Sequence, residues 1–199
     1  MIAIRGASST IAQQLIAMLP DGERAEAIPR GASMPVSVER YFFCVGLLRS
    51  KSMADQTEDE IGESMVANYN QVVFECDRLF SANACARICV MGSESGYSGS
   101  FDGSYALAKE RLHRYVETKR LQYPAQQLVC VAPSIVLNTG MTSRRADTEG
   151  LERRRWAHPK RRYLTAMEVA KMVYFLLYVD RGYTTGTIVR MHGGAAAWA

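Results

Sequence analysis

The stretch IAIRGASSTIAQQL, residues 2–15, decides the fold prediction. Residues 2–5 form a short apolar run, Gly6 begins a tight turn, and apolar residues then recur at helical spacing from Ile11 to Leu19. A strand, a glycine turn and a helix in this order are typical of an α/β protein. The chain is therefore expected to contain a sheet whose strands alternate with helices.

The same alternation continues along the chain. Apolar runs at 41–45, 86–91, 127–132 and 187–191 predict further strands, and the segment 24–28 is a candidate for another. Residues 55–80, 105–121 and 165–177 predict helices. Thr165 and Glu168 have the spacing of a capping box at the start of the last helix. Strands that are apolar on both faces belong to parallel sheets covered by helices on both sides. We predict a single α/β domain, residues 1–199, with a doubly wound, Rossmann-like sheet.

The composition agrees with one globular domain. The chain has 199 residues, of which 48% are hydrophobic and 22% charged, enough for a substantial core. Its five cysteines form no Cys-x-x-Cys pair, and no histidine cluster accompanies them. Reduced thiols in a cytoplasmic protein and no metal site are therefore expected. We see no signal peptide, and the apolar run 173–179 is too short to cross a membrane, so no membrane association is expected.

Positive charge is concentrated in one segment. The net charge is only +4, but residues 143–162 contain eight basic residues: Arg144, Arg145, Arg153, Arg154, Arg155, Lys160, Arg161 and Arg162. The segment is either a solvated loop and helix or a lid, at about residues 140–165, that attracts an anionic substrate. Nucleic acid is not expected as a partner, because Trp156 is the only aromatic residue between these charges.

Ser93, Tyr105 and Lys109 form the candidate catalytic set. Tyr105 and Lys109 are four residues apart and share one face of the predicted helix. An ammonium group there would favour the phenolate and lower the tyrosine pKa from about 10, so that Tyr105 could exchange protons near neutral pH. The Ser93 hydroxyl could hold and polarise a substrate oxygen. These groups suit the interconversion of an alcohol and a carbonyl if another group moves the hydride.

The same Tyr-x-x-x-Lys spacing recurs at Tyr115 and Lys119. On one helix the second pair lies roughly 80° around the axis and about 15 Å along it from the first. No comparable serine precedes it. We therefore expect the second pair to be a solvated helix face without a catalytic role.

In their order, these residues resemble the short-chain dehydrogenase/reductase family along nearly the whole chain. The resemblance is carried also by ANYNQV (67–72), APSIVLNTGM (132–141), EVA (168–170) and TTGTIVRMHGG (184–194). It implies that Asn68 completes a catalytic tetrad by fixing a water for proton relay. It also implies that Tyr105 is the general acid/base, that Ser93 orients the substrate oxygen and that Lys109 additionally holds the nicotinamide ribose.

The resemblance further implies two sets of binding residues. The expected cofactor-binding residues are Gly6, Ser8, Ser9, Thr10, Ile11, Arg30, Val45, Gly46, Lys109, Pro133, Ser134, Val136 and Thr139. The expected substrate-binding residues are Ser95, Tyr97, Met141 and Trp156.

The sequence departs from the family pattern on the cofactor side. The segment GASSTIA, residues 6–12, keeps one of the three family glycines, and Thr10 places a Cβ where the loop should approach phosphate. Residues 31–38 are too few for a helix and a strand, so the third family strand and its helix are expected to be missing. Six parallel strands should remain, in the order 2-1-4-5-6-7 of the family numbering. Arg24 and Arg30, with no acid at the end of the second strand, favour NADP(H) over NAD(H).

The predicted function is that of an oxidoreductase that interconverts a carbonyl and an alcohol with a nicotinamide dinucleotide. Family resemblance implies a small-molecule substrate and a homodimer or homotetramer. The eroded glycine loop leaves an alternative: a degenerate dinucleotide-binding sensor or interaction protein without catalytic activity.

Overall fold

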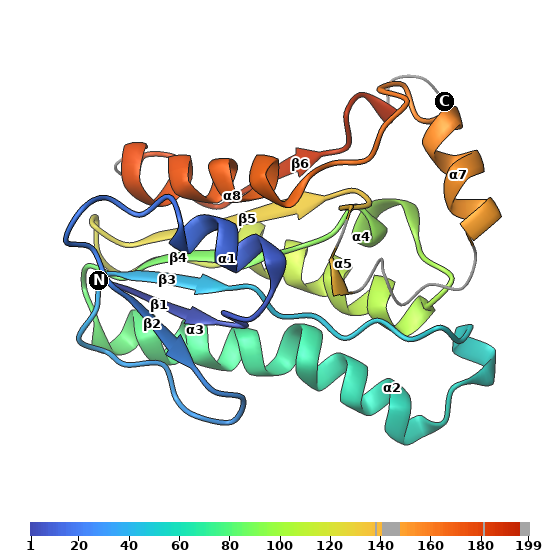
Figure 1. Ribbon diagram of the computed structural model, residues 1–199. Helices are drawn as coiled ribbons and strands as arrows, with labels where there is room; N and C mark the ends of the chain where they lie inside the picture. The colour runs from blue at the N-terminus through green and yellow to red at the C-terminus, as the bar shows by residue number, and fades with distance from the viewer. Residues whose placement is uncertain (138, 141–147, 181, 196–199) are drawn as a thin grey trace.

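Six parallel strands form one sheet in the order β2-β1-β3-β4-β5-β6 (Figure 1). The strands are β1 (Ile2–Arg5), β2 (Ala25–Ile28), β3 (Arg40–Phe43), β4 (Arg87–Met91), β5 (Gln127–Pro133) and β6 (Thr187–Met191). This computed structural model describes all residues except 138, 141–147, 181 and 196–199. The predicted six-stranded parallel sheet and its order are confirmed.

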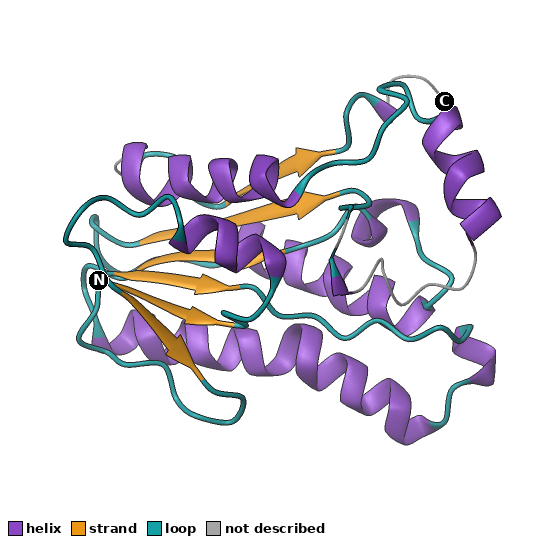
Figure 2. Cartoon of the chain, in the orientation of Figure 1, coloured by secondary structure: helices purple, strands orange, loops and turns teal. Residues whose placement is uncertain are grey.

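Helices cover both faces of the sheet (Figures 1 and 2). On one face, α1 (Thr10–Ile16) and α8 (Ala166–Tyr174) pack on the side chains of Ile2 and Ile4. On the other, α3 (Gln71–Ala82) and α5 (Gly103–Thr118) pack on Ala3. The apolar residues of β1 therefore alternate between two separate cores, as a strand buried on both sides requires.

The predicted helix 55–80 is divided by a π-helical turn. A capping box between Thr57 and Glu60 starts α2 (Glu58–Met65), a π-helical turn follows at Val66–Asn70, and α3 continues to Ala82. A short 3₁₀ turn, Met53–Asp55, precedes α2. The π-helical turn contains Asn68, so the long helix is irregular at a predicted site residue.

A short connection, residues 29–39, links β2 to β3 in place of a further strand and helix. Glu75 of α3 accepts a hydrogen bond from the Met34 N–H at 3.1 Å, and Arg78 donates to the Met34 carbonyl. Arg5 donates to the carbonyl of Ala32. Met34 itself is buried. Side chains of β1 and α3 thus fix the backbone of the shortened connection.

The second Tyr-x-x-x-Lys pair lies between two helices. Tyr115 Oη and Lys119 Nζ each donate to Asp77 of α3 at 2.6 Å. The expectation of a solvated face is therefore wrong, because α3 packs alongside this part of α5 and covers both side chains in part.

Two further helices lie beyond the carboxyl ends of the strands (Figure 1). The four-residue helix α4 (Ser95–Ser98) was not expected, and α7 (Thr148–Ala157) lies at one end of the molecule in Figure 1. The capping box between Thr165 and Glu168 is present at the start of α8, as predicted, and a π-helical turn, Phe175–Val179, follows that helix. No helix in the described part of the chain combines the length and apolar character needed to span a bilayer.

All five cysteines are free thiols, and only Cys85 is exposed. Within the described ranges, no three histidine, cysteine or acidic side chains lie close enough together to hold a metal ion.

Candidate active site

Ser93 and Tyr105 meet beside the carboxyl end of β4. Ser93 lies in the loop between β4 and α4, and Tyr105 lies in the first turn of α5. Both residues are buried, at 9% and 7% exposure. Burial raises the pKa of Tyr105, a hydrogen bond with the Ser93 side chain lowers it, and the charge of Asp102 raises it again. The net effect is a raised pKa, so the Tyr105 hydroxyl is a protonated donor at neutral pH.

Lys109 is fully surrounded by protein, one turn after Tyr105. Its ammonium donates to the carbonyl of Met91 at 2.7 Å and to that of Val45 at 3.3 Å, and lies 5.6 Å from the centre of the Tyr105 ring. Burial lowers the pKa of Lys109 to about 8. The expected lowering of the Tyr105 pKa by Lys109 is not found, because the ammonium is directed to backbone carbonyls and burial of the phenol outweighs other effects.

Asn68 is also buried, and its amide binds protein groups. Oδ1 accepts the Leu47 N–H at 2.9 Å, and Nδ2 donates to the Leu47 carbonyl at 2.9 Å. Nδ2 also donates to the Ser64 carbonyl at 2.9 Å. These contacts join the segment after β3 to the π-helical turn.

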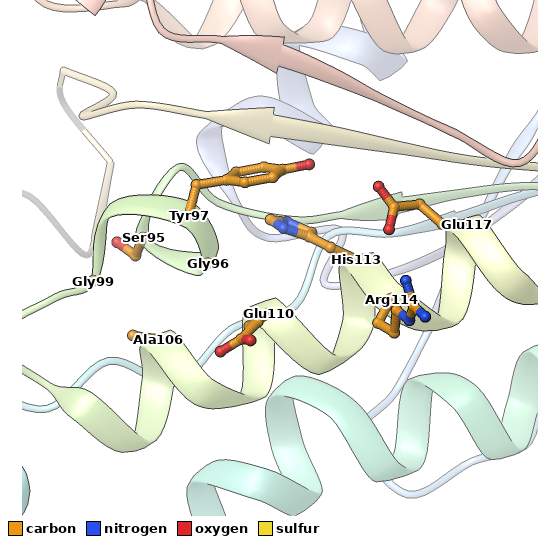
Figure 3. A pocket seen from close by; sticks show the side chains of 9 residues that line it. All are labelled: Ser95, Gly96, Tyr97, Gly99, Ala106, Glu110, His113, Arg114 and Glu117. Atoms are coloured by element: carbon orange, nitrogen blue, oxygen red, sulfur yellow. The ribbon is translucent and has the colours of Figure 1, made fainter. Parts of the chain in front are cut away.

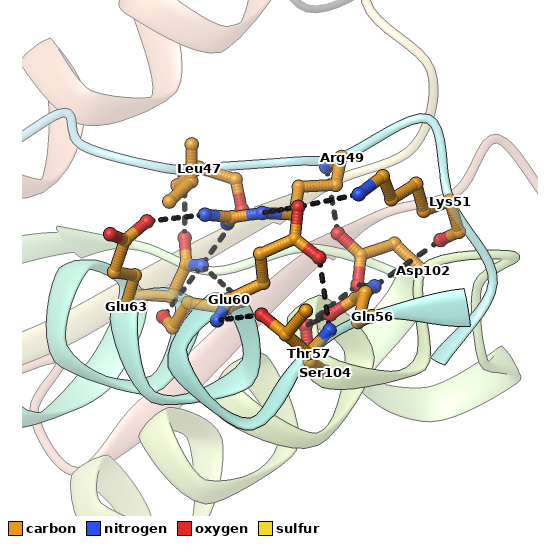
Figure 4. A network of polar contacts seen from close by, with 11 residues as sticks. Leu47, Arg49, Lys51, Gln56, Thr57, Glu60, Glu63, Asp102 and Ser104 are labelled. Carbon is orange, nitrogen blue, oxygen red and sulfur yellow. Dashed lines mark hydrogen bonds and ion pairs between the residues drawn. The ribbon is translucent and has the colours of Figure 1, made fainter. Parts of the chain in front are cut away.

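Asp102 was missed by the sequence analysis. It is the N-cap of α5, accepting the Tyr105 N–H at 3.1 Å, and it also accepts the Arg49 N–H at 2.7 Å and the Gln56 side chain at 2.9 Å (Figure 4). Burial acts to raise the Asp102 pKa, but these hydrogen bonds and one from Ser104 outweigh it and lower the pKa. The sequence did contain a signal for this role: Asp102 directly precedes the helix that carries Tyr105, and aspartate is a favoured N-cap residue. Asp102 therefore sets the start of the helix that carries Tyr105.

A cavity of about 360 Å³ lies beside the glycine turn, near the carboxyl ends of β1, β2 and β3. Five of the predicted cofactor residues line it, together with Arg5: Gly6, Ser8, Arg30, Val45 and Gly46. Gly6 has φ +85°, and a Cβ there would lie 2.2 Å from the Cys44 carbonyl oxygen, so the turn requires glycine. No acidic residue lines the cavity, and the buried Arg5 Nε has no hydrogen-bond partner among the described residues. Two arginines at such a cavity fit a phosphate-bearing nucleotide.

The other residues of the predicted phosphate loop support α1. Ser9 is the N-cap of α1, accepting the Ala12 N–H at 3.1 Å, and its hydroxyl lies 2.9 Å from Cys44 Sγ. Thr10 is the first residue of the helix. The Ile11 side chain packs into the core against the sheet, so only its backbone can face the loop.

The segment after β5 lies beside the Ser93 loop. The Glu94 N–H donates to the Pro133 carbonyl at 3.0 Å, and the Ser134 N–H donates to the Met191 carbonyl at 3.2 Å. Val136 is buried and pairs with Leu164 in an isolated bridge. Thr139 Oγ1 donates to the Val136 carbonyl at 3.3 Å. The structure thus brings this predicted cofactor-binding segment to the same edge of the sheet as Ser93.

The predicted substrate residues are dispersed. Ser95 and Tyr97 line a second cavity, of about 660 Å³, between α4 and α5 (Figure 3). Ser93, Tyr105 and Lys109 do not line that cavity. Trp156 is 62% exposed on α7, under the guanidinium of Arg155. Met141 lies outside the described residues.

No protein-family model matches the sequence, and no curated protein matches it either. Solved structures match the fold. A short-chain dehydrogenase family protein from Francisella tularensis subsp. tularensis SCHU S4 is 17% identical, with TM-score 0.80 and 98% of each chain covered. The aldohexose dehydrogenase AldT of Thermoplasma acidophilum is 16% identical, with TM-score 0.81 and coverage of 100% of this chain and 94% of that one. A tyrosine-to-phenylalanine variant of ElxO with NADPH bound is 16% identical, with TM-score 0.75 and 98% of each chain covered.

The chain therefore has the fold of short-chain dehydrogenase/reductase structures across nearly its whole length. Its described site combines a buried phenol, a buried serine hydroxyl and a buried ammonium within one region. Such a set can hold an oxygen atom and transfer a proton to it.

Proposed function

We propose that the chain is an oxidoreductase that interconverts a carbonyl and an alcohol with a nicotinamide dinucleotide. The observation that carries this proposal is the burial of the Tyr105 and Ser93 side chains together with Lys109 beside the carboxyl end of β4 in this fold. The Ser93 oxygen accepts the N–H of Ser95, the first residue of α4, at 3.1 Å, and its O–H can still be donated to a substrate.

In this proposal the Ser93 and Tyr105 hydroxyls donate hydrogen bonds to the carbonyl oxygen of the substrate. As negative charge develops on that oxygen, Tyr105 transfers its proton to it and becomes a phenolate. The Lys109 ammonium lies 5.6 Å from the Tyr105 ring centre but is directed to backbone carbonyls, and solvent returns a proton to the phenolate. The raised pKa keeps Tyr105 protonated at neutral pH, the state in which it can donate to a carbonyl oxygen, but it also makes the phenol a weaker acid.

The cofactor would be held by the cavity that contains Gly6, Ser8 and Gly46, and a bound nicotinamide supplies the hydride in reduction and accepts it in oxidation. Arg30 lines the same cavity, and no acidic residue does; Arg5 also lines it but lies 3.9 Å from the buried Glu75. This charge balance supports NADP(H) over NAD(H), since a 2′-phosphate adds negative charge at that end of the cofactor.

The basic residues of α7 support an anionic small-molecule substrate. Arg153 and Arg154 are exposed, while Arg155 lies 3.3 Å from Glu152. The free thiols are compatible with a cytoplasmic location. We further propose a homodimer or homotetramer, as the family resemblance implies.

A non-catalytic dinucleotide sensor is the second candidate. It is favoured by the shortened connection between β2 and β3, which leaves fewer residues to contact the adenosine part of a cofactor. A sensor would bind the cofactor but would lose nothing when Tyr105 is replaced.

Calorimetric titration with NADPH, NADH and their oxidised forms tests the proposal. We expect dissociation constants in the micromolar range for NADPH, and no binding of any form at millimolar concentration contradicts the oxidoreductase function. Once a cofactor binds, a panel of carbonyl compounds is reduced with the wild type and with Tyr105→Phe. Loss of about 10²-fold or more in rate for the variant supports the enzyme, whereas no turnover by either protein supports the sensor.

A further inference from the structure

We propose that His113 is a positioning residue that fixes Ser93 against the helix of Tyr105. The inference rests on the proposed function, because it assigns a role relative to the proton-transferring pair. His113 lies on α5, eight residues after Tyr105, and is 3% exposed. It belongs to none of the residues that the family resemblance assigns.

The imidazole contacts the Ser93 loop at several points. Nε2 accepts the Ser93 N–H at 3.4 Å. A Cβ at Gly92 would lie 2.5 Å from Nε2, and a Cβ at Gly96 would lie 2.7 Å from Cε1. The Tyr97 ring stacks on the imidazole with ring centres 4.7 Å apart (Figure 3). The two glycines thus let the loop and α4 close onto the histidine ring.

These contacts connect the two halves of the catalytic pair. The loop that His113 holds carries Ser93, and the helix that carries His113 also carries Tyr105 and Lys109. A second restraint acts from the strand side, where the Glu94 N–H donates to the Pro133 carbonyl. The separation between the serine and tyrosine hydroxyls therefore depends on the imidazole.

Only a neutral imidazole with an unprotonated Nε2 can accept the Ser93 N–H. Burial, together with the charges of Lys109 and Arg190, lowers the pKa of His113 to about 4. The polar and titratable groups around the ring come from every element packed on it: Glu110, Arg114 and Glu117 of α5, Tyr97 of α4, Cys130 of β5, and Arg190 of β6 paired with Glu94. The neutral form is therefore maintained throughout the physiological pH range.

The neutral ring also lowers the stability of the fold in a way that an apolar side chain at this position would not. With Nε2 as acceptor, Nδ1 carries the proton, and Nδ1 is buried with no hydrogen-bond partner among the described residues. An unpaired buried donor opposes folding, so an apolar side chain would fill this space at lower cost. What histidine adds is the acceptor for Ser93.

The test compares His113→Leu, which removes the acceptor, with His113→Gln, whose side-chain oxygen can accept the same N–H. Val116→Ala is the control for destabilisation, because Val116 is buried on the same helix in the core beneath the sheet. We expect His113→Leu to lower kcat by about 10-fold to 10²-fold, with the NADPH dissociation constant unchanged, since a misplacement of about 1 Å can cost that much. His113→Gln should recover part of the rate, and Val116→Ala should keep kcat within about twofold.

Nitrogen NMR of the wild type provides a readout that needs no substrate. We expect the His113 ring in the neutral form protonated on Nδ1, and a change in the Ser93 amide signal in both His113 variants. A ring protonated on Nε2, or a kcat for His113→Leu equal to that of Val116→Ala, overturns the inference. If the wild type binds no cofactor, the proposed function fails, while the tautomer and the Ser93 amide signal still decide whether His113 holds the serine loop.

Discussion

The side-chain amide of Asn68 and the backbone of Leu47 exchange two hydrogen bonds, each 2.9 Å long. A third bond, from Nδ2 to the Ser64 carbonyl, is also 2.9 Å. The amide is completely buried. Its visible role is therefore to hold the segment after β3 against the π-helical turn, whatever part Asn68 has in proton relay.

Asn68→Ala should lower the free energy of unfolding by about 2–4 kcal/mol, because the N–H and carbonyl of Leu47 both lose their partner, at about 1–3 kcal/mol for each buried group. Urea denaturation measures the change. Asn70→Ala is the matched control, since Asn70 is exposed in the same turn. Unchanged stability with lost activity would instead support the relay role alone.

The contribution of Lys109 to the free energy of unfolding should change with pH in the alkaline range. Its pKa is lowered from 10.5 to about 8 in the folded protein, so the unfolded chain binds more protons between these values. Stability should therefore rise as the pH increases from about 8 to 10.5, by an amount on the order of 3 kcal/mol. Urea denaturation at several pH values, with Lys109→Met as reference, isolates this effect. A difference between the two proteins that stays constant from pH 7 to about 10 contradicts the prediction.

Gly6→Ala should destabilise the protein by at least about 3 kcal/mol, because the added Cβ meets the Cys44 carbonyl in a backbone conformation that disfavours alanine. Gly62→Ala should instead stabilise it by about 0.5–1 kcal/mol, since Gly62 lies in α2 with open space around it. Thermal denaturation compares the two. Equal effects would show that the glycine turn tolerates a side chain.

Arg30→Ser should weaken NADPH binding by about tenfold or more, because a charged partner of the 2′-phosphate is lost. NADH binding should change little. Arg24→Ser is the control, since Arg24 precedes the other end of β2 and does not line the cavity. Calorimetry measures the affinity of each variant for NADPH and for NADH. An equal loss for both cofactors would show that Arg30 does not discriminate between them.

Reversal of Arg153, Arg154 and Arg155 to glutamate should raise KM for an anionic substrate by about tenfold or more at low salt, and less at high salt, because the attraction is electrostatic. The kcat should remain close to that of the wild type. A neutral substrate with the same carbon skeleton is the control. If KM for the anionic substrate is unchanged while circular dichroism shows an intact fold, α7 is a solvated helix without a role in substrate attraction.

Much of the fold could be predicted because its signals are local. The strands β3, β4 and β5 are buried on both faces, so their sequences are continuous apolar runs. A strand with one face in solvent would alternate apolar and polar residues instead. The capping box of Thr165 and Glu168 needs only four residues. The missing strand was predictable from length, since residues 31–38 cannot form a crossover.

The π-helical turn, α4 and the contacts of Tyr115 with Asp77 were not predictable in this way. Each depends on which helix packs beside which, and no local pattern records that. The direction of the Tyr105 pKa shift was likewise decided by burial, which a helix-face argument could not include.

The sequence by itself determined the alternation of strands and helices and the spacing of Tyr105 and Lys109, because hydrophobic period and helical spacing are properties of neighbouring residues. The sheet order was predicted from the family resemblance. The tertiary structure alone decided that Asn68 holds Leu47, that Asp102 caps the tyrosine helix and that His113 receives the Ser93 N–H. Two of these contacts span about twenty residues of chain, and Asp102 also binds the distant segment after β3. Their partners are chosen by packing, where burial makes each unpaired polar group costly.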